Sequence, residues 1–75
     1  MYKLIEYYEE NGKVKWHLCG FAPTKEKIDD IKDEMAKELN QVGIEALEVI
    51  ATKNIDSMKE ILKREDIKIF QAIKE

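Results

Sequence analysis

The side chains of this sequence that are best suited to chemistry stand close together in its N-terminal segment. His17 and Cys19 are the only histidine and the only cysteine of the chain. They are two positions apart, so they project from the same face of an extended strand. An imidazole and a thiol can act together as soft metal ligands, or as a general base and a nucleophile. A site of this kind has to be built around these two residues.

Two further residues join this set if the preceding segment forms the neighbouring strand. Glu6 would then lie directly across from His17, and Tyr8 would share the same face. The candidate ligand-binding residues are therefore Glu6, Tyr8, His17 and Cys19. The plain alternative is an ordinary cross-strand pair of Glu6 and His17 beside a small apolar cysteine. Side chains at i and i+2 are about 6.5 to 7 Å apart at their bases, so contact requires them to lean together.

No larger catalytic pattern accompanies these residues. The sequence has no Gly-rich phosphate loop, no paired-carboxylate signature, no Ser-His-Asp order and no zinc-knuckle spacing. We therefore expect no catalytic residue, no resident metal and no cofactor. A small domain with so few reactive groups is more often a binding or assembly module than an enzyme.

The segment that must position these side chains is a β-hairpin over residues 2–21. Asn11-Gly12 lies between two alternating runs, and this dipeptide best tolerates the two positive φ angles of a type I′ turn. The expected pairs are Leu4 with Cys19, Ile5 with Leu18, Glu6 with His17, Tyr7 with Trp16, Tyr8 with Lys15, and Glu9 with Val14. The face expected to meet the core consists of Ile5, Tyr7, Val14, Trp16 and Leu18.

Helical periodicity follows the hairpin. Thr24 is the expected N-cap of a helix from Lys25 to about Gln41, and Gly43 is placed to end it. The apolar stripe of this helix is Ile28, Ile31, Met35, Leu39 and Val42.

The last third of the chain predicts a strand, a helix and a strand. Residues 44–52 are apolar on both alternating faces, which suits a central strand. Asn54 is the expected cap of a second helix, and the final strand covers residues 66–73. The inward side of this second helix is Ile55, Met58, Ile61 and Leu62.

The order ββαβαβ predicts one α+β domain over residues 1–75: a two-layer sandwich with a four-stranded mixed sheet and two helices. The layout loosely resembles ferredoxin-like sandwiches, although the element order differs from their doubled strand-helix-strand unit. If both helices cover one face, the other face is bare and apolar. Its members would be Leu4, Tyr8, Cys19, Ala46, Ile50, Phe70 and Ala72, and the interface residues expected among them are Leu4, Tyr8, Cys19, Ile50 and Phe70.

Such a face predicts a homo-oligomer or a protein partner. The net charge of −3 and the scarcity of arginine provide no basic surface for nucleic acid. No apolar run has the length of a signal peptide or a membrane span, so we expect a cytoplasmic protein. A weaker alternative is an acidic inhibitor that mimics nucleic acid, against which the lysines interleaved along residues 25–41 argue.

Overall fold

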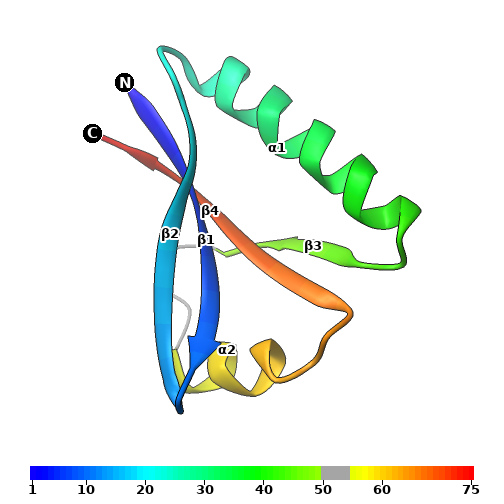
Figure 1. Cartoon of the computed structure of the whole chain (residues 1–75). Helices are drawn as coiled ribbons and strands as arrows, with labels where there is room; N and C mark the ends of the chain where they lie inside the picture. Colours follow the sequence, from blue (N-terminus) through cyan, green and yellow to red (C-terminus); the bar gives the residue numbers. More distant parts are fainter. Residues whose placement is uncertain (50–54) are drawn as a thin grey trace.

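The computed structural model describes residues 1–49 and 55–75, apart from the side chain of Ile55. The described elements follow the predicted order ββαβαβ and form an α+β fold (Figure 1). They are β1 (Tyr2–Glu10), β2 (Lys13–Ala22), α1 (Lys25–Gln41), β3 (Glu45–Glu48), α2 (Ile55–Leu62) and β4 (Ile67–Lys74). The predicted fold class is therefore confirmed.

The strands form one mixed sheet in the order β2-β1-β4-β3. β1 is antiparallel to β2 and β4, whereas β3 runs parallel to β4. The prediction of a central strand over residues 44–52 is wrong in the described part, because β3 is a short edge strand. β1 and β4 are the two central strands, and β4 holds the fully buried Ile69 and Phe70. Residues 50–52 lie outside the described residues.

The hairpin turn is the one that Asn11-Gly12 predicts, with φ angles of 53° and 79°. From Glu9 opposite Val14 to Ile5 opposite Leu18, every predicted pair is present. The last predicted pair is wrong: Leu4 lies opposite Gly20, because a bulge shifts the register between Leu4 and Ile5. Cys19 is the extra residue of that bulge.

Substitution of Gly12 by alanine is expected to destabilise the protein by about 1–2 kcal/mol, because a Cβ strains a backbone with positive φ. Only the flexible end of Lys59 lies near the new atom, at 3.9 Å, so the strain is in the backbone. Gly20→Ala is the matched control: its φ is not positive, and its Cβ would meet Ile31 at an ordinary 3.7 Å. Urea unfolding of both variants checks this, and equal losses would contradict it.

α1 begins and ends at the predicted residues. The Thr24 hydroxyl accepts a hydrogen bond from the Lys27 backbone N–H at 3.2 Å, and Gly43 follows the helix with φ of 80°. Ile28 is fully buried, and the next three residues of the stripe pack beside it. Val42 does not continue the stripe, because it is the C-cap and turns towards solvent, 71% exposed.

The two helices pack on opposite faces of the sheet, at opposite ends. α1 covers the face that carries Leu4 and Phe70, near the chain termini. α2 covers the other face near the hairpin turn, where Met58 packs with Ile67 and Ile69. Figure 1 shows this separation, with α2 beside the β1-β2 turn. Each half of the sheet is thus a two-layer packing of strands and one helix.

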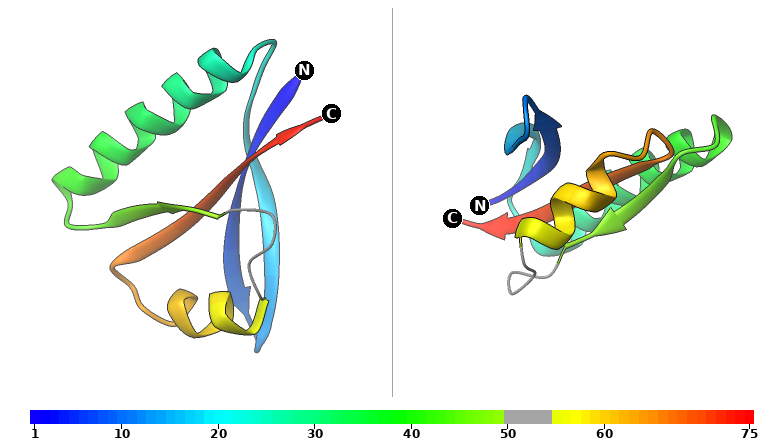
Figure 2. Two further views of the ribbon diagram at one scale, coloured as in Figure 1. Left: turned by 180° about the vertical axis from the view of Figure 1, so that it is seen from behind. Right: turned by 90° about the horizontal axis from the view of Figure 1, so that it is seen from below.

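This arrangement leaves two quarters of the sheet without a helix. One is the face of the hairpin around Glu6 and His17, and the other is the opposite face around Leu18 and Phe21. The sheet twists strongly between them, so that β1 and β2 run across the direction of β3 (Figure 2). The candidate sites lie in these two quarters.

The second helix agrees with its predicted inward side where it is described. Met58 is buried, and Ile61 and Leu62 pack against the same cluster. The predicted cap Asn54 and the side chain of Ile55 lie outside the described residues.

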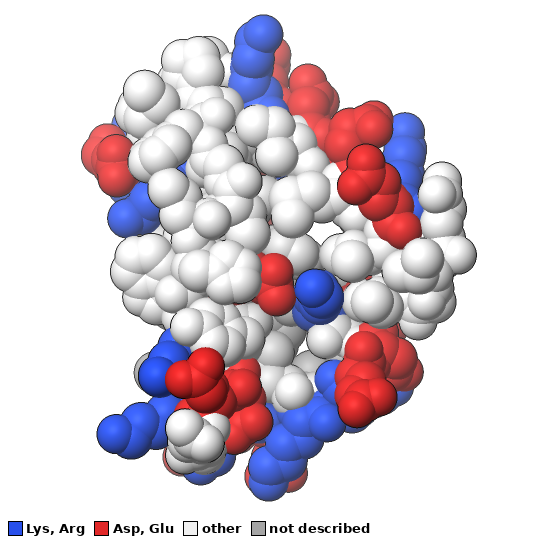
Figure 3. All heavy atoms as spheres, in the orientation of Figure 1, with Lys and Arg blue, Asp and Glu red and all other residues white. Residues whose placement is uncertain are grey.

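The surface charge is mixed on the face shown by Figure 3. Both acidic and basic side chains lie along α1 and around the hairpin end, without a region of single sign.

Candidate functional site

The polar quarter of the sheet contains the predicted set of chemical side chains. Glu6 of β1 lies directly opposite His17 of β2. The Nε2 atom of His17 is 3.3 Å from Oε1 of Glu6. The Glu6 side chain is only 13% exposed, whereas that of His17 is 53% exposed. The pair therefore has a sheltered carboxylate and an accessible imidazole.

Cys19 joins this pair. One ligand atom each from Glu6, His17 and Cys19 lies within 4.8 Å of the other two. The bulge explains why the thiol lies close to the other two ligand atoms. It inserts Cys19 as an extra residue of β2 that has no partner on β1. The Cys19 thiol also lies 4.0 Å from the carbonyl oxygen of His17. Three donors of different chemistry, oxygen, nitrogen and sulfur, thus converge at the edge of the α1 core.

Two neighbours flank the cluster. The Tyr8 ring packs against the His17 ring, with centroids 5.3 Å apart and planes tilted by 37°. The Nζ atom of Lys68, on β4, is 3.9 Å from the second carboxylate oxygen of Glu6. Tyr8 therefore limits the orientation of the His17 ring. Lys68 was not among the residues predicted for this cluster. Lys68 lies on the strand next to β1, a neighbour that only the strand order reveals.

The pKa of the Cys19 thiol is raised above its ordinary value. Burial is the largest cause, because it disfavours the charged thiolate, and the negative charge of Glu6 adds to the shift. Lys68 and a backbone hydrogen bond act in the opposite direction. The thiol is therefore protonated near neutral pH and is a poor nucleophile on its own.

The bare face expected from the sequence is not bare at its centre. Leu4 and Phe70 are at most 1% exposed and form the core beneath α1. They cannot serve as surface contacts, because α1 and α2 lie on opposite faces rather than on one. Tyr8 and Cys19 are partly buried, and Ile50 lies outside the described residues.

A different apolar surface is exposed instead. Trp16, Leu18 and Phe21 of β2 are 53%, 45% and 52% exposed. They share the face that α2 covers only near the hairpin turn. The prediction that Trp16 and Leu18 belong to the core is wrong, whereas Ile5 is buried and Tyr7 and Val14 pack under α2 as expected. We call these three residues the β2 apolar surface.

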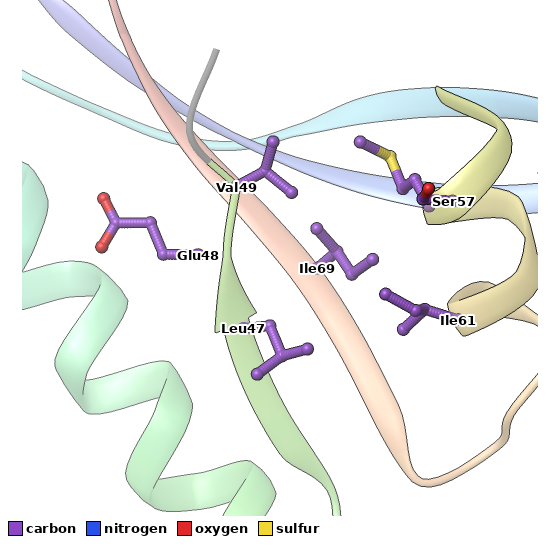
Figure 4. Close-up of a pocket in the computed structure, with 7 residues that line it drawn as sticks. Leu47, Glu48, Val49, Ser57, Ile61 and Ile69 are labelled. Carbon is purple, nitrogen blue, oxygen red and sulfur yellow. The ribbon is translucent and has the colours of Figure 1, made fainter. Parts of the chain in front are cut away.

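A pocket with a volume of about 270 Å³ lies between α2 and the β3-β4 pair. Figure 4 shows Leu47, Val49, Ile61 and Ile69 pointing into it. Glu48 points the other way, towards α1, where it pairs with Lys32 at 2.6 Å. The pocket offers apolar contact and few polar groups, so it lacks the convergent donors that fix a ligand's orientation.

Comparison with known proteins gives no relative: no family model, no curated protein and no solved structure matches this chain. Within residues 1–49 and 55–75, no helix is long and apolar enough to cross a membrane. Two surfaces of the sheet therefore remain as candidate sites: the cluster of Glu6, His17 and Cys19, and the β2 apolar surface.

Proposed function

We propose that this protein is a non-enzymatic assembly domain that associates with a second copy of itself through the β2 apolar surface. The observation that carries the proposal is the exposure of Trp16, Leu18 and Phe21 on one face of one strand. Large apolar side chains exposed singly are common, but a contiguous group of them is typical of an interaction surface.

The position of β2 supports this proposal. β2 is an edge strand of ten residues, and no described residue pairs with its outer side. Long unpaired edges readily join another strand, and a two-fold axis beside β2 would bring the same apolar surface of each copy together. Apolar side chains can pack against an identical surface of a second copy, whereas a cluster of like charges would repel its own copy. The nearby Lys3 ammonium lies over the Trp16 ring, 5.3 Å from its centroid.

The size of the exposed surface is also consistent with a partner. The chain exposes 5277 Å², whereas a folded monomer of its 8.8 kDa exposes about 4,800 Å². The radius of gyration is 12.2 Å, against about 11 Å expected for a compact chain of this length.

Sedimentation velocity over a range of protein concentrations tests the proposal. We expect a monomer–dimer equilibrium in which Phe21→Glu raises the dissociation constant at least about tenfold, since it places a charge in the contact. The new carboxylate would face Lys3 across the hairpin, so the fold should persist. Val42→Glu is the matched control, because it adds the same charge at another exposed apolar residue.

Three results would overturn this reading. One is a wild-type protein that stays monomeric at every concentration, and another is an equal weakening by the Phe21 and Val42 variants. The third is a dimer that persists unchanged in Phe21→Glu. Far-UV circular dichroism of each variant confirms that the comparison is made between folded proteins.

A further inference from the structure

We propose that Glu6, His17 and Cys19 form an open binding site for a zinc ion, separate from the β2 apolar surface. The three ligand atoms lie within 4.8 Å of one another. Zinc bonds of about 2.0–2.3 Å in a tetrahedral arrangement require ligand atoms about 3.3–3.6 Å apart. Nε2 of His17 and Oε1 of Glu6 already meet this spacing at 3.3 Å. The Cys19 thiol would have to move closer to the other two ligands to complete the set.

The donor types select the class of metal. An imidazole nitrogen and a thiol sulfur favour zinc and similar transition metals over magnesium or calcium, which prefer oxygen ligands. Nε2 is the ring nitrogen that faces Glu6, so it is the histidine atom that would bind the metal. Bound zinc would displace the Cys19 proton and take the thiolate as its ligand.

The surroundings supply partners for the ligands. Glu6 can bind through Oε1 while its other oxygen stays near Lys68, 3.9 Å away. Such an outer cation would hold the carboxylate in a monodentate orientation, and Tyr8 would hold the imidazole plane. Lys68 also repels a dication, but its side chain is 41% exposed and can move towards solvent.

The site would be open rather than closed. Three protein ligands leave the fourth position for water or for an outside ligand, as in zinc sites that are not purely structural. The His17 side of the cluster is exposed, so this position is accessible. The register explains why sequence spacing alone does not reveal the site: the donors come from two strands and meet through a bulge.

Zinc titration in competition with a chromophoric chelator tests the proposal on the whole protein. We expect saturable binding of one ion per chain, weakened at least about 100-fold in each of Glu6→Gln, His17→Gln and Cys19→Ser, because loss of a ligand exceeds loss of an outer partner. Glu10→Gln is the matched control: Glu10 is on the same strand and pairs with Lys15 at 2.9 Å, outside the cluster. Its zinc affinity should equal that of the wild type.

Cobalt substitution gives a second measurement. We expect thiolate-to-cobalt charge-transfer absorption in the wild type and its loss in Cys19→Ser. Unfolding curves recorded with chelator present identify any variant that has lost its fold rather than a ligand. Absence of saturable zinc binding, or equal zinc affinity in Glu6→Gln and Glu10→Gln, would overturn the site and leave an ordinary Glu-His pair. Phe21→Glu should bind zinc as the wild type does, so the zinc site and the proposed dimer are tested independently.

Discussion

Truncation of Phe70 to alanine is expected to lower the free energy of unfolding by about 3–5 kcal/mol. Phe70 is 1% exposed on a central strand, and it packs with Leu4, Ala22 and Ile28 beneath α1. A chain of this length has a total stability of about 4–11 kcal/mol, so the loss would remove a large share of it. The cost combines the lost burial of the ring with the cavity left between sheet and helix.

Urea unfolding at several protein concentrations measures this effect. Phe21→Ala is the matched control, because it removes the same side chain from a position that is 52% exposed. Its cost should stay below about 1 kcal/mol in dilute solution. If the β2 apolar surface joins two copies, the cost of Phe21→Ala should grow with concentration, whereas that of Phe70→Ala persists in the monomer. Equal costs in dilute solution would contradict the assignment of Phe70 to the core.

The parts of the fold that sequence reasoning predicted are those with local causes. The Asn11-Gly12 turn sets the hairpin register as far as the pair of Ile5 and Leu18, and Thr24 and Gly43 mark the limits of α1. Each of these features depends on backbone preferences within a few residues. The period of two also assigned side chains to the correct faces of β4.

Which face would be covered could not be predicted, because that depends on contacts distant in sequence. Leu4 and Leu18 are both apolar residues of the same hairpin, yet α1 covers Leu4 and no described helix covers Leu18. An alternating pattern indicates two faces but not where a later helix packs. The sequence therefore predicted Trp16 as core and Phe70 as surface, the reverse of their burial.

The candidate site was predicted only in part, because some of its contacts have local causes and others do not. The pairing of Glu6 with His17 followed from the turn, and Cys19 followed from the period of two. The bulge that brings the thiol near Glu6 has no clear signal in the sequence beyond Gly20, the residue after it. Gly20 lies against Ile31 of α1, so the bulge lies next to the contact between β2 and this helix.

The packing of α2 is expected to depend most on Ile69. Replacement of Ile69 by alanine should cost about 2–5 kcal/mol, because its side chain is 1% exposed in the cluster with Met58 and Ile67. Ile73→Ala is the matched control, since Ile73 lies on the same strand and face but beyond α2 and only partly buried. We expect it to cost less than half as much.

Hydrogen exchange locates the effect of Ile69→Ala. Loss of the side chain should speed amide exchange in α2 more than in α1, because the two helices pack against separate clusters on opposite faces. Uniform acceleration in both helices would mean that the clusters unfold as one unit. A cost for Ile73→Ala equal to that of Ile69→Ala would show instead that α2 does not set the burial of this face.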